Sequence, residues 1–262
     1  MRIPQAALAL AGLISLWQAV VVFVAPPRYL LPSPLAVAQV FLHQPAFLAH
    51  HMMITATEVV VGLIAGSLLG FLTALFVAAL PRLGQFVWPV VLVLQALPVF
   101  VLAPVLVLWF GFGLASKVVM TVIIIFFPVA SAFADGLNRT DRDILDAASL
   151  TVASHWQILT RIRLPLALPS LVSGLRVAAP LAPLGAVVGE WVGAAGGLGF
   201  IMIQANARMQ ADQLFAAMLV LALFSVLLRL LIDRLTAGLA PWAREEAHPP
   251  RTIPPSRRIS LS

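Results

Sequence analysis

The sequence predicts an all-α protein that crosses a membrane six times, and two observations lead to this class. Of the 262 residues, 61% are hydrophobic and only 10% are charged, whereas soluble domains carry about 25% charged residues. The mean hydropathy is +1.04, and apolar runs recur along the whole chain. This composition leaves too few charged side chains to cover a water-exposed surface. It therefore excludes a cytosolic enzyme and a soluble nucleic-acid-binding protein.

Six apolar runs approach the roughly 20 residues that a helix needs to cross about 30 Å of hydrocarbon. The first run follows Arg2 as in a signal peptide, but its length and the following Pro26 and Pro27 favour a retained helix. The fifth run contains Arg176, which we expect near the helix end with its guanidinium reaching toward the interface. The predicted spans are 6–24, 59–80, 86–110, 118–134, 170–188 and 214–232.

Small residues and prolines distinguish three of the spans. In the second span, small residues recur at every fourth position from Gly62 to Ala78, which predicts close packing against another helix. Prolines interrupt the third and fifth spans, and the carbonyls that they leave without donors need neighbouring helices or water. These two spans are therefore predicted to line the bundle interior or a cavity, although kinks without a pore would also explain them. The prolines are Pro89, Pro98, Pro104, Pro180 and Pro183.

The basic residues predict the orientation of the chain. Alternate connecting segments and both termini carry twelve Lys and Arg residues when Arg176 of the fifth run is counted with them, while the opposite segments carry only Arg28, Lys117 and Arg208. The positive-inside rule then places the N- and C-termini in the cytoplasm. The sequence pI near 11.4 is accordingly interpreted as a topology signal rather than as a nucleic-acid-binding surface.

No catalytic, cofactor or metal motif is found in the sequence. The chain has no cysteine, so disulfides and thiolate metal sites are excluded. Its only lysine, Lys117, lies in a run that lacks the flanking Gly and Ser/Thr of a Walker A loop. His43, His50 and His51, with Glu58, could be metal ligands, but polar residues beside a span are ordinary. We expect no metal site, no cofactor and no enzyme activity, with any ATP hydrolysis on a partner chain.

The segment 135–169 is too polar to span the membrane and too long for a simple turn. Thr140 with Asp143, and Ser154 with Gln157, have capping-box spacing, which predicts two short helices, 141–150 and 155–163. The second helix presents Trp156, Leu159 and Ile162 on one face. This apolar face either packs on its own protein or inserts into a groove on a partner.

Within this segment, Asp146-Ala147-Ala148 followed by Ile162-Arg163-Leu164-Pro165 resembles the EAA motif of permease subunits of binding-protein-dependent ABC importers. The resemblance implies a type I importer permease fold in which 139–165 forms coupling helices that dock on an ATPase subunit. Two residues depart from the family pattern: Asp146 replaces the usual Glu, and Val152 replaces a Gly. The implied docking residues are Asp146, Ala147, Ala148, Val152, Trp156, Ile162, Leu164 and Pro165.

Further motifs are similar to the nitrate, sulfonate and taurine branch of these permeases. They are Leu31-Pro-Ser-Pro34, Leu97-Pro98, Trp109-Phe-Gly111 and Gly189-Glu-Trp-Val-Gly193. The run from Leu97 to Ser131 is most similar to permeases assigned to the pyrimidine precursor of thiamine. The implied partners are a periplasmic substrate-binding protein, an ATP-binding subunit and a second permease copy. The implied organisation is a first helix and periplasmic segment (1–58), a permease core (59–242) and a disordered cytoplasmic tail (243–262).

Polar residues at membrane depth usually face a cavity, so Gln95, Glu190, Asn206 and Arg208 are candidates for the translocation path or its outer gate. Glu190 and Arg208 could instead be charges at headgroup level. Two other function classes remain open. An ion-coupled secondary transporter would need more ionisable groups inside the membrane, and no acid falls inside a predicted span. A membrane scaffold protein would have no need of a hairpin with a coupling motif.

Overall fold

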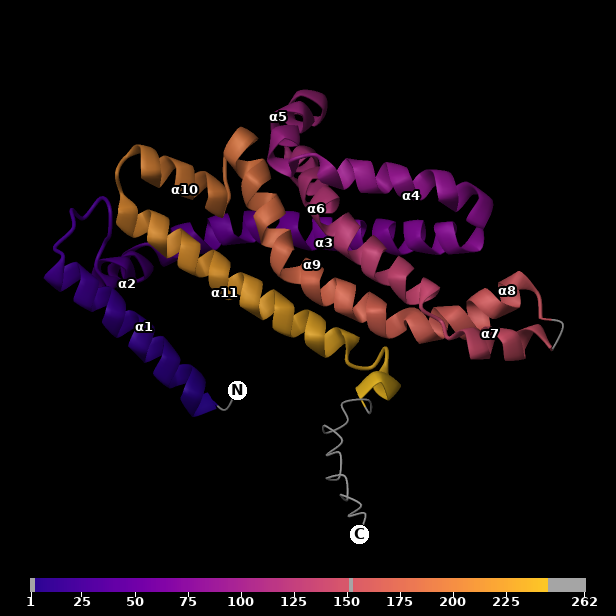
Figure 1. The fold of residues 1–262 in the computed structure, drawn as a ribbon. Helices are drawn as coiled ribbons and strands as arrows, with labels where there is room; N and C mark the ends of the chain where they lie inside the picture. The colour runs from indigo at the N-terminus through magenta and orange to yellow at the C-terminus, as the bar shows by residue number, and fades with distance from the viewer. Residues whose placement is uncertain (1–2, 151–152, 245–262) are drawn as a thin grey trace, which may run out of the picture.

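The computed structural model describes residues 3–150 and 153–244, which are helical wherever they are regular (Figure 1). The prediction of an all-α chain is confirmed over these residues. Val152 and residues 245–262 of the predicted tail lie outside them. The elements are α1 (Ile3–Phe23), α2 (Pro34–His43), α3 (Pro45–Ala79), α4 (Pro81–Ala96), α5 (Val99–Phe110), α6 (Leu114–Asn138), α7 (Arg142–Ser149), α8 (His155–Ile158), the π-helical η1 (Leu159–Arg163), α9 (Leu164–Gly193), α10 (Leu198–Ala207), α11 (Ala211–Thr236) and the 3₁₀-helical η2 (Pro241–Arg244).

Helix α6 lies at the centre of the bundle and packs against α3 on one side and α9 on the other. The small-residue stripe predicted for packing does face α6, because a Cβ added at Gly62 would come within 2.5 Å of the Thr121 side chain. The same holds at Gly66, where the added Cβ would lie 2.9 Å from Ile125 Cβ. Glycine lets the two backbones approach closely enough for Val129 and Phe133 of α6 to be fully buried.

Four helices are long and apolar enough to cross a membrane, and the pair α4 and α5 adds a fifth crossing if it counts as one broken span. The continuous third span predicted over 86–110 is wrong, because the pair bends by 98°. Leu97 and Pro98 are extended at the break, and Pro98 has no N–H to continue the helical ladder. The six-span count is not confirmed, since the apolar part of α1, Leu8–Phe23, is shorter than the other spans.

The predicted separation between the second hairpin helix and the fifth span is wrong. Helices α8, η1 and α9 form one continuous helical segment, His155–Gly193, of 39 residues. Its π-helical turn immediately precedes Pro165, and the Leu164 amide bonds to the Leu159 carbonyl five residues back. Pro165 cannot donate to the carbonyl four residues earlier, and its ring would crowd that carbonyl in an α-helix. A wider turn relieves this crowding, so the helix continues instead of ending.

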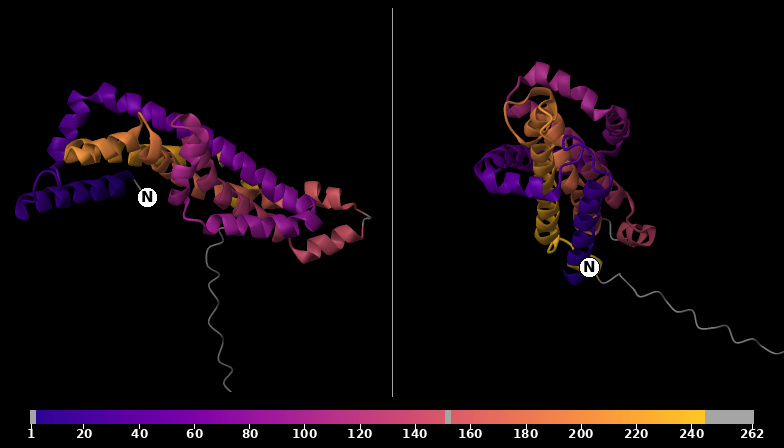
Figure 2. Two further views of the ribbon diagram at one scale, coloured as in Figure 1. Left: turned by 90° about the horizontal axis from the view of Figure 1, so that it is seen from above. Right: turned by 90° about the vertical axis from the view of Figure 1, so that its left-hand side faces the viewer.

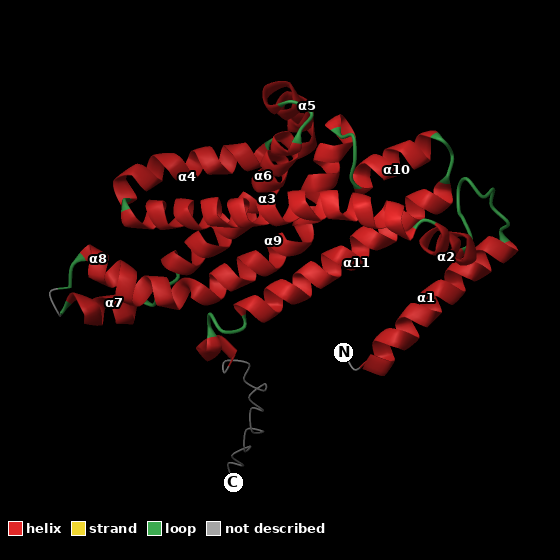
Figure 3. Cartoon of the chain, turned by 180° about the vertical axis from the view of Figure 1, so that it is seen from behind, coloured by secondary structure: helices red, strands yellow, loops and turns green. Residues whose placement is uncertain are grey.

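The bundle is elongated, with different elements at its two ends (Figure 2). The hairpin of α7 and α8 projects from one end, which we call the hairpin end. Helices α2 and α10 lie at the opposite end, beside the start of α3 and of α11 (Figure 3). Helix α1 is attached there through Trp17, whose Nε1 donates to Pro32 O at 3.0 Å and whose ring stacks on Phe215 at 5.7 Å.

Candidate functional site

Both hairpin helices, α7 and α8, have side-chain caps at their N-termini, as the sequence predicts. Only one of the two predicted capping boxes forms. The Ser154 hydroxyl accepts from the Gln157 amide at 3.3 Å, and Gln157 Oε1 accepts from the Ser154 amide at 2.8 Å. The predicted Thr140–Asp143 box is wrong, because Asp141 caps α7 instead by accepting from the Asp143 amide at 3.0 Å. Asp141 has a carboxylate, which is the better acceptor at a helix N-terminus.

The structure brings the two halves of the predicted coupling motif together. Ala147 and Ala148 of α7 line the same hollow of about 570 Å³ as Ile162 of η1, although they are distant in sequence. Asp146 is exposed on α7, and Leu164 and Pro165 are half-buried where η1 passes into α9. Residues from both halves of the motif therefore meet around one hollow at the hairpin end.

Trp156 is the largest apolar side chain of the hairpin helices, and 58% of its surface is exposed. It also borders a second hollow of about 570 Å³ that is lined by Leu72, Phe76 and Leu80 near the end of α3, and by Val87 of α4. Trp156 therefore lies between the exposed surface of the hairpin and the hollow beside α3 and α4.

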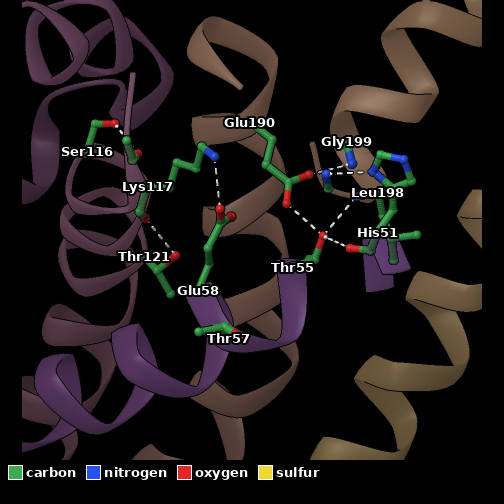
Figure 4. A network of polar contacts seen from close by, with 12 residues as sticks. His51, Thr55, Thr57, Glu58, Ser116, Lys117, Thr121, Glu190, Leu198 and Gly199 are labelled. Atoms are coloured by element: carbon green, nitrogen blue, oxygen red, sulfur yellow. Dashed lines mark hydrogen bonds and ion pairs between the residues drawn. The ribbon is translucent and has the colours of Figure 1, made fainter. Parts of the chain in front are cut away.

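At the opposite end of the bundle, the structure buries an ion pair that the sequence analysis missed. Lys117 Nζ of α6 lies 3.0 Å from Glu58 Oε1 of α3, with side-chain exposures of 7% and 1% (Figure 4). The predicted spans begin just after Glu58 and just after Lys117, whereas α3 begins at Pro45 and α6 at Leu114. Both residues therefore lie within helices that are long and apolar enough to cross a membrane.

Glu190 of α9 lies beside this pair and holds the start of α10. Its carboxylate accepts from the Thr55 hydroxyl at 2.6 Å and from the Gly199 amide. Thr55 Oγ1 in turn accepts from the Leu198 amide at 2.8 Å (Figure 4). Because the first amides of a helix lack intrahelical partners, these side chains of α3 and α9 cap α10. Glu190 is only 2% exposed, so it is not a charge at headgroup level.

His51 completes this arrangement, which we call the outer cluster: His51, Thr55, Glu58, Lys117 and Glu190. Its Nδ1 accepts from the Gly197 amide at 3.0 Å. His51, Thr55 and Glu58 recur at helical spacing on one face of α3, a signal that could have identified a polar face within a longer span. No local pattern, however, indicates that Lys117 and Glu190 would meet this face.

Gln95 and Asn206, two of the other path candidates, line different hollows. Gln95 lines a largely apolar hollow of about 500 Å³ between α3, α4, α5 and α6. Asn206 lines a separate hollow of about 680 Å³ between α9, α10 and α11. Arg208 is exposed just after α10. The role of these three side chains and of Glu190 in transport stays a prediction.

A second charged group lies between α9 and α11, and we call it the inner arginine cluster: Arg176, Arg229 and Asp233. Asp233 Oδ1 forms an ion pair with Arg176, whose Nε lies 2.8 Å away, and Asp233 Oδ2 accepts a hydrogen bond from Arg229 Nε at 3.1 Å. Arg229 also donates to the Arg176 carbonyl oxygen. The expectation that Arg176 lies near a helix end is wrong, because α9 extends well beyond it on both sides. An ion pair with α11 accommodates its charge instead.

Comparison with known proteins decides the family. The family described as "Binding-protein-dependent transport system inner membrane component" matches residues 62–245, more than two thirds of the chain. The chain belongs to this family. It is also 45% identical over 232 residues to a probable ABC transporter permease protein of Haemophilus influenzae, covering 88% of this chain and 95% of that one. The chain is thus a non-catalytic permease subunit of an ABC importer, and ATP hydrolysis belongs to a separate subunit.

Two further relatives bear on the branch and the fold. The formylaminopyrimidine transport permease ThiX of Halalkalibacterium halodurans is 36% identical, with 83% of this chain and 88% of that chain covered. The taurine transport permease TauC of Escherichia coli is 29% identical, with 90% and 88% covered. Among solved structures, an inward-facing MetNI methionine ABC transporter chain gives a TM-score of 0.65 at 21% identity, covering 75% of this chain and 98% of that one. The last comparison supports the type I importer permease fold.

Proposed function

We propose that this permease pairs with a second copy of itself and works with two ATPase subunits and a periplasmic binding protein. The observation that carries the proposal is the hairpin surface formed by α7, α8 and η1, on which Ala147, Ala148 and Ile162 meet around one hollow. Closure of the ATPase subunits would move this surface. The movement would reach the membrane directly, because the second hairpin helix continues into α9 without a break.

The same proposal places the hairpin end and both chain termini in the cytoplasm. Basic side chains at the hairpin end include Arg82, Arg139, Arg161 and Arg234. At the other end Lys117 is buried in an ion pair, so it does not present a free charge to the outer interface. This burial strengthens the positive-inside argument, because only Arg28 and Arg208 remain as opposing charges.

For the substrate we propose a small polar solute delivered by the binding protein, with the pyrimidine precursor of thiamine as first candidate. The similarity to ThiX supports this candidate, while the similarity to TauC supports a sulfonate or taurine-type solute as the alternative. Gln95 in its hollow is the proposed residue of the path, and Glu190, Asn206 and Arg208 are the proposed residues of the outer gate. The bend between α4 and α5 lies beside the Gln95 hollow and would shape its opening.

Co-purification and uptake test the ATPase partnership. We expect the ATPase subunit to co-purify with the wild-type chain, and Trp156→Ala combined with Asp146→Ala to abolish both association and ATP-driven uptake in proteoliposomes. Trp242→Ala is the matched control, since Trp242 is also exposed, at 46%, but lies in η2 outside the hairpin. Intact uptake by the double variant, or no ATPase recovered with the wild type, contradicts the proposal.

Ligand binding by the cognate binding protein tests the substrate. We expect it to prefer a thiamine pyrimidine precursor over taurine and alkylsulfonates in calorimetric titrations. A preference for an alkylsulfonate would show that the first candidate is wrong while leaving the importer assignment intact.

A further inference from the structure

The inner arginine cluster has more positive than negative charge. Two guanidinium groups share the single carboxylate of Asp233, and no other acid in the described residues pairs with Arg176 or Arg229. The side chains of Arg176 and Arg229 are 36% and 40% exposed. Apart from the Arg229 Nη1 that donates to the Arg176 carbonyl, their Nη donors have no hydrogen-bond partner within the described residues. An uncompensated charge in transmembrane helices is expensive. The cluster therefore favours an additional anion.

An apolar groove begins one helical turn from this cluster. We call it the α9–α11 groove; it is the hollow of about 680 Å³ that Asn206, a proposed gate residue, borders from α10. Pro180 of the groove lies one turn beyond Arg176 on α9, and Ser225 lies one turn before Arg229 on α11. Residues four apart share a helix face, so the cluster is placed at one end of the groove. The remaining lining is almost entirely apolar and includes Leu184, Trp191, Met218 and Leu221.

The position of the cluster along α11 fits a membrane interface. From Ala211 to Arg229, α11 rises about 27 Å at roughly 1.5 Å per residue, close to the hydrocarbon thickness of about 30 Å. If the start of α11 lies at one interface, Arg229 lies near the other. From Leu214 to Ser225 the groove extends about 16 Å along the helix, comparable to the hydrocarbon depth of one leaflet, about 15 Å.

We propose that the inner arginine cluster and the α9–α11 groove together bind one anionic glycerophospholipid. Its phosphate accepts hydrogen bonds from the outward-facing donors of Arg176 and Arg229, which neutralises the excess charge. One acyl chain lies along the groove and covers its apolar wall. Assignment to the cytoplasmic leaflet rests on the orientation proposed above, whereas binding depends only on α9 and α11.

Lipid retention measured by native mass spectrometry tests the site. The full-length permease, purified with its ATPase subunit, is equilibrated with equal amounts of phosphatidylglycerol and phosphatidylcholine and then delipidated stepwise. We expect the wild type to retain phosphatidylglycerol preferentially and Arg229→Gln to lower this preference about fivefold. Arg234→Gln, on the same helix but outside the cluster, is the matched control and leaves the preference unchanged. Ala222→Phe fills the groove and lowers retention of both lipids.

Asp233→Asn separates lipid binding from a purely structural ion pair. A structural pair loses its only anion in this variant and gains no lipid. A lipid site loses a competitor for the two guanidinium groups, so the preference for phosphatidylglycerol rises. Because weakened folding cannot raise the preference, this variant remains informative even if Arg229→Gln is unstable.

Several outcomes would overturn the lipid site. One is an equal preference for phosphatidylglycerol in Arg229→Gln and Arg234→Gln, and another is unchanged lipid retention in Ala222→Phe. A third is displacement of the lipid by excess inorganic phosphate. The fourth is cross-linking of Ser225→Cys between two copies, which would make the groove a subunit interface. Failure to recover the ATPase subunit would instead count against the proposed function. In that case the lipid measurement is repeated on the permease alone.

Discussion

The two charged clusters inside the helical bundle differ in burial, charge balance and partners. The outer cluster is almost completely buried, contains two carboxylates and one lysine, and connects α3, α6, α9 and α10. The inner arginine cluster is more than one-third exposed, contains two arginines and one carboxylate, and connects α9 with α11. Burial makes the first cluster depend on its own protein partners, whereas exposure leaves the second open to external ions.

This difference also separates two ways of joining helices in a membrane. In the outer cluster, side chains of α3 and α9 satisfy the free amides at the start of α10, so a broken backbone is tolerated next to transmembrane helices. In the inner arginine cluster, the backbone of both helices is already satisfied internally, and the charges act only between side chains and one carbonyl. Loss of the first arrangement therefore costs backbone hydrogen bonds, while loss of the second does not.

The largest expected effect follows from removing Lys117. Lys117→Met leaves Glu58 buried beside Glu190 without a cation, and breaking a buried ion pair in this way costs about 3–5 kcal/mol. We expect a correspondingly lower unfolding midpoint for the detergent-solubilised protein in denaturant titrations. Glu58→Gln combined with Lys117→Met removes both charges and should recover most of the loss. A single variant as stable as the wild type would contradict the role assigned to the pair.

An intermediate effect is expected at Thr55. Thr55→Val is nearly isosteric but leaves the Leu198 amide without its acceptor and Glu190 without one donor, at a cost of about 1–3 kcal/mol. Amide hydrogen exchange should become faster at the start of α10. Thr57→Val is the matched control, because the Thr57 hydroxyl is exposed and bonds only to the Met53 carbonyl of its own helix. Equal exchange in the two variants would show that Thr55 does not hold α10.

Sequence patterns predict the local and periodic features of this fold but not the pairing of distant charges. The Gly62 and Gly66 stripe correctly indicates close helix packing, since its spacing alone defines the face. Ser154 with Gln157 correctly indicates a helix start, because both partners lie within one turn.

By contrast, the Glu58–Lys117 pair joins residues on two helices whose register is set by the packing of α3 on α6. A span predicted from hydropathy also ends at the first charged residue. The predicted second span therefore begins after Glu58, although helix α3 starts at Pro45. The presence of a proline does not by itself predict whether a helix ends. Pro98 breaks a span, whereas Pro165 only widens a helical turn. Which outcome occurs depends on whether neighbouring residues can supply other donors for the affected carbonyls.

The smallest effect on stability is expected at Asp233. Asp233→Ala removes an ion pair whose groups are more than one-third exposed, and such pairs contribute about 0–1 kcal/mol. The unfolding midpoint should therefore stay close to that of the wild type, in contrast to Lys117→Met. Asp212→Ala, on the same helix but outside the cluster, is the control for loss of an acidic residue. A loss at Asp233 as large as that at Lys117 would mean that the inner arginine cluster is closed to solvent and lipid in the assembled transporter, and the contrast between the two clusters would disappear.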